Sequence, residues 1–164
     1  VKKRSKWETK GRERTTKILN NLSTKYNNVE IDIIFNVSLD ECIKRKSNCD
    51  IIIDECVTGS FHRSGLEGLA LGKLTICSLD QKVIDLLKKV SSSKTIPFYN
   101  IWIDDLENDL CKIINRGKSY IQNIGKNNRI WMEEYWNPKI IVKEYINYYS
   151  EILKEQNSLL KKKQ

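Results

Sequence analysis

The sequence predicts an α/β domain built on a parallel sheet with helices on both faces. Strand-like and helix-like patterns alternate along the 164 residues, without any repeat or low-complexity tract. Residues 51–53 are three isoleucines, typical of a strand that is buried on both faces. Strands that alternate with helices are joined by right-handed crossovers, which place helices on both sides of the sheet. The length is that of about one domain.

Four segments have the patterns of strands. Residues 29–35 alternate apolar and acidic side chains before an apolar run, and residues 51–53 lie between two aspartates. The other two are the apolar stretches 74–77 and 99–103. An opening strand is expected before the first helix, but the sequence after Val1 shows none. We therefore expect a fragment that lacks its first strand.

Apolar side chains at helical spacing predict helices between and after these strands. Ser38 and Glu41 form a capping box at the start of one helix, Asp104 caps another, and Gly72 ends a third. The expected helices cover residues 10–26, 38–46, 64–71, 80–90, 104–114, 126–136 and 139–160, the last of which closes the domain.

Positive charge is concentrated at the two ends of the chain. The net charge is +8; residues 1–17 carry +6 and residues 161–163 carry +3, which leaves −1 for the body. A basic end is more often a solvated tail than a binding patch. We therefore expect no nucleic-acid partner. A nucleic-acid-associated protein that uses the basic arm is a third interpretation, which salt-dependent binding would reveal.

The cysteines and the single histidine predict no metal site. The five cysteines include no Cys-x-x-Cys pair, and His62 is the only histidine. Reduced thiols in apolar runs are typical of a cytosolic protein.

No apolar run reaches the ~18–20 residues of a membrane span. We predict a cytoplasmic protein without a cofactor, and weak peripheral contact with a membrane is left open.

Residues 50–76 have the features of a ligand-binding edge. Ligands of open α/β sheets bind beyond the carboxyl ends of the strands, beside helix amino-termini. Here a strand ends at Asp54, a loop follows, and a helix starts at Ser64. Free N–H groups, the helix dipole and Arg63 would attract a phosphate. Neither the Walker A loop nor the dinucleotide fingerprint fits the glycine spacing.

Residues 66–76 read Leu-Glu-Gly-Leu-Ala-Leu-Gly-Lys-Leu-Thr-Ile. This order resembles the donor-binding signature of GT-B glycosyltransferases of the group-1 (family 4-like) set. Their motif is Leu-Glu-Ala-(Leu/Met)-Ala-x-Gly-Lys-Pro-Val-Ile, so Gly68, Leu74 and Thr75 are the departures. The resemblance covers about residues 6–153; its other parts are Lys10-Gly11 at the first helix, and Trp136-Asn137-Pro138 and Tyr148-Tyr149 near the end.

The resemblance implies the donor-binding domain of a retaining glycosyltransferase. Such an enzyme transfers a sugar from a UDP-, GDP- or ADP-type donor to an acceptor hydroxyl without a metal. The loop and Lys10 would hold the diphosphate, and Glu67 would bind the ribose. The implied donor-binding residues are Lys10, Gly59, Ser60, Phe61, His62, Arg63, Ser64, Gly65 and Glu67; Asn36, Val37 and Ser38 would lie near the base.

Residues 1–164 are interpreted as a single domain without the amino-terminal acceptor domain of that family. We therefore expect the chain by itself to be inactive, and no catalytic residue is assigned. The alternative is a non-catalytic α/β binding module, receiver-like or partner-binding; a receiver would need clustered acids at its strand ends. For Glu67, the local alternative is a capping box with Ser64.

Overall fold

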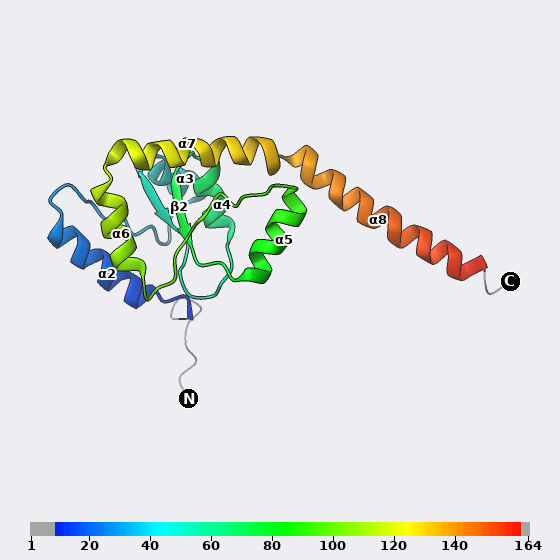
Figure 1. Cartoon of the computed structure of the whole chain (residues 1–164), viewed down its shortest axis with the longest axis horizontal. Helices are drawn as coiled ribbons and strands as arrows, with labels where there is room; N and C mark the ends of the chain where they lie inside the picture. The colour runs from blue at the N-terminus through cyan, green and yellow to red at the C-terminus, as the bar shows by residue number, and fades with distance from the viewer. Residues whose placement is uncertain (1–8, 162–164) are drawn as a thin grey trace, which may run out of the picture.

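The structure, a computed structural model, describes residues 9–161. Three strands form a parallel sheet in the order β1-β2-β3 (Figure 1). Ile51 pairs with Leu74, and Ile76 pairs with Tyr99. The strands are β1 (Ile51–Ile53), β2 (Leu74–Cys77) and β3 (Tyr99–Asn100). The predicted α/β fold with a parallel sheet is confirmed.

Helices come before, between and after the strands. Their bounds are α2 (Arg12–Lys25), α3 (Leu39–Asn48), α4 (Arg63–Ala70), α5 (Gln81–Ser91), α6 (Leu106–Asn115), α7 (Lys118–Tyr135) and α8 (Pro138–Lys161). The helix α7 begins eight residues before the predicted start at 126.

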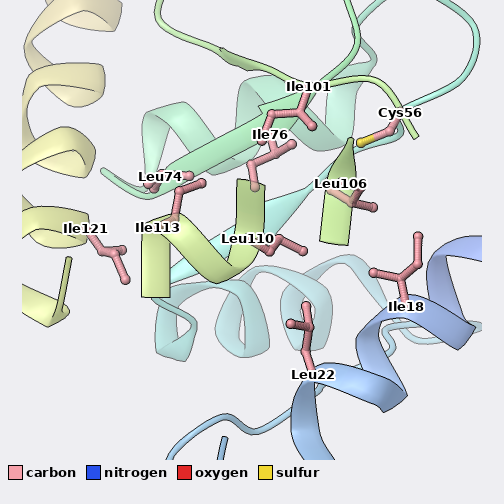
Figure 2. Close-up of a cluster of buried hydrophobic side chains, with 10 residues drawn as sticks. All are labelled: Ile18, Leu22, Cys56, Leu74, Ile76, Ile101, Leu106, Leu110, Ile113 and Ile121. Carbon is pink, nitrogen blue, oxygen red and sulfur yellow. The ribbon is translucent and has the colours of Figure 1, made fainter. Parts of the chain in front are cut away.

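Helices pack on both faces of the sheet because side chains alternate along β2. Leu74 and Ile76 contribute to one core, which is filled from α2 and α6 (Figure 2). Cys77 belongs to a second core, with side chains from α4, α5 and α7. The first core consists of Ile18, Leu22, Cys56, Leu74, Ile76, Ile101, Leu106, Leu110, Ile113 and Ile121.

The prediction of a strand at residues 29–35 is wrong. In the part of the chain that the structure describes, residues 30–37 form no backbone–backbone hydrogen bond. Ile33 and Phe35 are 45% and 50% exposed, while Asp32 forms an ion pair with Arg45 of α3. An alternating pattern makes a strand only where a second strand offers hydrogen bonds. The expectation that an opening strand is missing concerns residues 1–8, which lie outside the described residues.

Two predicted helix ends are confirmed and one is wrong. Ser38 caps α3, since its Oγ accepts a hydrogen bond from the Glu41 N–H at 3.2 Å. Gly72 follows α4 with a φ of +68°, a left-handed conformation that suits glycine. Asp104, however, does not cap α6: Asp105 occupies the N-cap position, and Asp104 pairs with Arg14 at 2.6 Å. The third strand is also shorter than expected, ending at Asn100 rather than at 103.

The helix α7 crosses the turn between α4 and β2 in close contact. Asn128 donates from Nδ2 to the Lys73 carbonyl at 2.8 Å, and Arg129 donates to the Ala70 carbonyl at 2.5 Å. A Cβ atom on Gly125 would lie 2.1 Å from the carbonyl oxygen of Gly72. This crossing therefore requires glycine at position 125.

The helix α8 continues beyond α7 and extends away from the body (Figure 1). It touches the body at α5. None of the described helices is both long enough and apolar enough to cross a bilayer.

Candidate functional site

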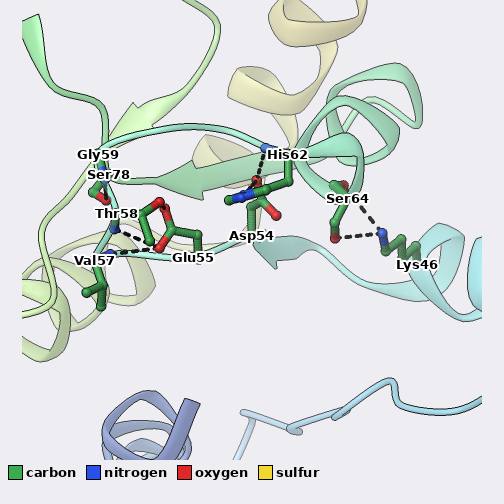
Figure 3. A network of polar contacts seen from close by, with 9 residues as sticks. All are labelled: Lys46, Asp54, Glu55, Val57, Thr58, Gly59, His62, Ser64 and Ser78. Carbon is green, nitrogen blue, oxygen red and sulfur yellow. Dashed lines mark hydrogen bonds and ion pairs between the residues drawn. The ribbon is translucent and has the colours of Figure 1, made fainter. Parts of the chain in front are cut away.

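The loop between β1 and α4 lies at the carboxyl edge of the sheet, where a ligand was predicted to bind (Figure 3). Gly59, at the middle of the loop, has a φ of +76°. Its N–H donates to Ser78 Oγ at 3.2 Å, and its carbonyl accepts from the Asp80 N–H at 2.9 Å. These bonds fasten the loop to the residues that follow β2.

Glu55 is buried under the first half of this loop and accepts hydrogen bonds from it. The residue is only 4% exposed. Its carboxylate accepts hydrogen bonds from the N–H groups of Val57 and Thr58 and from the Thr58 hydroxyl, at 2.7–3.0 Å. The neighbouring Cys56 is fully buried, and burial raises the pKa of its thiol to about 12. Neither residue is available to a ligand, and Cys56 fills space in the core.

Asp54 supports the second half of the loop. Its side chain is 3% exposed and accepts a hydrogen bond from the His62 N–H at 2.6 Å. His62 Nδ1 lies 3.5 Å from the same carboxylate oxygen. Burial raises the pKa of Asp54, opposed by the hydrogen bond from the His62 N–H and by the nearby His62 and Lys10 side chains. A Cβ atom on Gly11 would lie 2.5 Å from Val57 Cγ2, so the chain beside Lys10 packs against this loop.

Four backbone N–H groups, two in the loop before α4 and two in its first turn, have no protein acceptor within residues 9–161. They belong to Ser60, Phe61, Arg63 and Ser64. The amides of His62 and Gly65 do not join them, because they donate to Asp54 and to the His62 carbonyl. The predicted set of loop amides is thus present in part. Four open donors beside a positive helix end suit an anion.

Glu67 forms a buried ion pair with Lys46 of α3 instead of a capping box. Lys46 Nζ lies 2.7 Å from Glu67 Oε2 and donates to Ser64 Oγ at 2.8 Å. The other carboxylate oxygen of Glu67 lies 3.0 Å from Arg63 Nε. The capping-box alternative is wrong, because α4 begins at Arg63 with His62 at its N-cap position and no side-chain cap.

Sequence reasoning missed Lys46 as a part of this site. The side chains of Lys46 and Glu67 are 8% and 18% exposed, so both charges are largely withdrawn from water. A signal was present: Lys46 lies four residues after Cys42, on the side of the helix that faces the body. A lysine at such an apolar position indicates a buried partner.

The predicted base-proximal residues lie before α3 and beside the start of α2. The Arg12 guanidinium lies 4.9 Å from the centre of the Phe35 ring, which places Asn36, Val37 and Ser38 near the first turn of α2. Asn36 has a φ of +54°. No hydrogen bond or ion pair among the described residues joins Asn36 or Val37 to the loop at 59–67.

The described residues 9–161 bring no three His, Cys, Asp or Glu side chains together as metal ligands would be. Compared with family models, with curated proteins and with solved structures, the chain has no match in any of the three.

Asp54→Asn is expected to remove a pH-dependent destabilisation. Burial raises the folded-state pKa of Asp54, so the folded protein binds the proton more tightly than the unfolded chain. Stability then falls as pH rises from the ordinary Asp value, about 3.9, through the raised value. Asparagine keeps an acceptor for the His62 N–H and carries no charge. Urea unfolding at a series of pH values should show the free energy of unfolding of the variant rising relative to that of the parent across this window. A difference that does not change with pH would contradict a raised pKa of Asp54.

Proposed function

We propose that the loop at the carboxyl edge of the sheet binds the diphosphate of a nucleotide-sugar donor. The chain would then be the donor-binding domain of a retaining GT-B glycosyltransferase of the group-1 set. The observation that carries the proposal is that the N–H groups of Ser60, Phe61, Arg63 and Ser64 are open, at the carboxyl edge of a parallel sheet. The motif at residues 66–76 adds the sugar-donor chemistry.

The charges around the loop support this ligand. Arg63 has a side chain that is 80% exposed, and Lys10 is close enough to lower the pKa of Asp54. In the proposed complex, both cations would contact a diphosphate that rests on the open amides. Fixed donors and cations of this kind stabilise the charge that develops on a departing nucleoside diphosphate, which makes a metal unnecessary.

Glu67 would bind the ribose while the Lys46 ammonium holds it in place. A carboxylate fixed by a buried cation keeps one orientation, and its oxygen beside Arg63 lies toward the exposed side of α4. In the proposed enzyme, the sheet would be one Rossmann-like half of the GT-B fold. The acceptor hydroxyl would come to a second, acceptor-binding domain, and the protein would act in the cytoplasm.

Titration with UDP, GDP and ADP tests the proposal. Calorimetry or thermal shift should detect binding of at least one of the three, unchanged by EDTA and weakened by salt. Salt weakens it because the attraction rests on exposed charges. If none binds, the proposal is overturned and the non-catalytic binding module becomes the better interpretation. Loss of binding in EDTA, restored by Mg²⁺ or Mn²⁺, would reject the metal-free site.

Arg63→Ala is expected to weaken the binding of that nucleotide by about tenfold or more. A hydrogen bond to a charged group contributes ~1.5–3 kcal/mol, and 1.4 kcal/mol corresponds to a factor of ten. Arg116→Ala is the matched control, because it removes the same charge at the carboxyl end of α6 and costs only a stacking contact with Tyr120. Equal affinities for the two variants would exclude Arg63 from the site.

A further inference from the structure

Three residues meet at one end of the loop between β1 and α4, each from the segment that follows a different strand. Gly59 belongs to that loop, Asp80 follows β2, and Trp102 follows β3. A Cβ atom on Gly59 would lie 3.3 Å from Cη2 of the Trp102 indole and 3.4 Å from Asp80 Oδ2. The indole and the carboxylate are therefore neighbours beside Gly59, and we call them the Asp80–Trp102 pair.

The main chain holds both members of the pair in place. On either side of Trp102, the N–H groups of Ile101 and Ile103 donate to carbonyls of β2 and of the loop after β1, at 3.1 and 2.8 Å. Because side chains alternate along an extended chain, Trp102 points away from the core that Ile101 and Ile103 face. The Asp80 N–H donates to the Gly59 carbonyl at 2.9 Å. A ligand would therefore meet the pair in a fixed position.

Both side chains of the pair are open to water. Trp102 is 42% exposed, and Asp80 is exposed as well. Asp80 uses one oxygen, Oδ1, to cap α5 by accepting from the Val83 N–H at 2.9 Å. In the part of the chain that the structure describes, no donor reaches the other oxygen, Oδ2. The pair thus offers a large aromatic ring and a charged acceptor, side by side, to a group outside the chain.

A sugar ring has the chemistry that this pair can recognise. Its hydroxyl groups are donors, which a carboxylate oxygen accepts. Its C–H groups form an apolar face, which packs on an indole. A phosphate does not suit the same place, because the negative charge of Asp80 repels it.

The position of the pair agrees with the order of the groups in a nucleotide sugar, in which the diphosphate joins the ribose to the sugar. Figure 3 shows Gly59 at one end of the loop and Ser64 at the other. Lys46 binds both Ser64 and Glu67, so the proposed ribose site is at the Ser64 end. A diphosphate on the open amides between them, with its ribose at Glu67, would turn its sugar toward the Asp80–Trp102 pair.

We propose that the Asp80–Trp102 pair is the subsite for the sugar of the nucleotide-sugar donor. Asp80 Oδ2 accepts a hydrogen bond from a sugar hydroxyl, and the Trp102 indole packs against the C–H face of the ring. The subsite depends on the proposed function, because the diphosphate on the open amides brings the sugar to it.

Calorimetric titration of the full chain with matched pairs of ligands tests the subsite. The pairs are UDP and UDP-glucose, GDP and GDP-mannose, and ADP and ADP-glucose. Trp102→Ala should weaken the binding of the nucleotide sugar by about tenfold and leave that of the nucleoside diphosphate nearly unchanged. Asp80→Asn keeps an acceptor for the cap of α5 but loses the charge. It should weaken the binding of the nucleotide sugar alone, by about fivefold.

Two further variants are the controls. Trp102→Phe keeps an aromatic ring and should retain most of the affinity for the nucleotide sugar. Asp85→Asn removes the same charge more than one turn further along α5, where Asp85 accepts a hydrogen bond from Gln81 of the same helix. It should change neither affinity. Unchanged binding of the nucleoside diphosphate also shows that a variant is folded.

The outcomes separate the subsite from the function on which it depends. A parent that binds no nucleoside diphosphate rejects the proposed function, and the subsite with it. Where a nucleoside diphosphate binds, the subsite alone is overturned if none of the three nucleotide sugars binds. It is also overturned if Trp102→Ala and Asp80→Asn weaken both ligands of a pair equally, as stacking on the base would cause, or if neither change weakens the nucleotide sugar.

Discussion

Gly125→Ala is expected to lower the free energy of unfolding by about 3 kcal/mol or more, among the larger costs of overpacking a tightly packed position. The new Cβ would lie 2.1 Å from the Gly72 carbonyl oxygen and 3.2 Å from the Lys73 Cα. Both atoms belong to the main chain, so no side chain can rotate out of the way. Because α7 packs against both α4 and β2, relieving the clash would separate α7 from the core.

Gly117→Ala is the control for this change. Gly117 has a φ of +84°, but a Cβ there would meet nothing within 4 Å. Its cost should be limited to backbone strain, about 1–3 kcal/mol. Urea unfolding followed by tryptophan fluorescence measures both variants. A cost at Gly125 no greater than that at Gly117 would show that α7 can shift, contrary to the packing described above.

Lys46→Met is expected to cost about 3 kcal/mol, because it leaves Glu67 largely buried without its main partner. Arg63 does not replace that partner, since an ion pair with an exposed guanidinium contributes little. The double variant Lys46→Met/Glu67→Gln removes both charges together. It should therefore cost about 2 kcal/mol less than the two single changes added together.

Lys112→Met provides the matched control for an exposed pair. Lys112 Nζ lies 2.6 Å from Asp109 Oδ1, as close as the atoms of the buried pair, but its side chain is 72% exposed. The change should cost only about 0.5 kcal/mol. If the costs at Lys46 and Glu67 were strictly additive, the two side chains would not be coupled, and α3 would not be fastened to α4 through them.

The sequence predicted those features of the fold that depend on one segment at a time. The isoleucines at 51–53 form a buried strand, and Ser38 and Gly72 mark helix ends, because these properties are decided within a few residues. The strand predicted at 29–35 depended on a neighbouring strand, which a local pattern cannot provide. The long α7 was missed in its first two turns, where polar residues such as Lys118, Ser119 and Gln122 interrupt the apolar spacing.

In the candidate site, too, the sequence predicted the local features and missed the contacts between distant segments. The position of the loop followed from Asp54 at the end of an apolar run and from the helix start beyond it. The partners of the side chains did not follow, because they come from distant segments. Glu67 and Ser64 are three residues apart and fit a capping box, yet both bind Lys46, some twenty residues earlier. Whether the site binds a nucleotide sugar stays a prediction, which the titration decides.

The loop between β1 and α4 is held in its shape by hydrogen bonds within the chain. Glu55, Asp54 and Ser78 accept hydrogen bonds from backbone N–H groups of the loop. The N–H groups of Ser60 and Phe61 have no such partner among the described residues. If an anion binds there as proposed, it would not have to organise the backbone, so little conformational entropy would be lost on binding. Selectivity would then come from the fit of the ligand to a shape that the acidic side chains of the loop already fix.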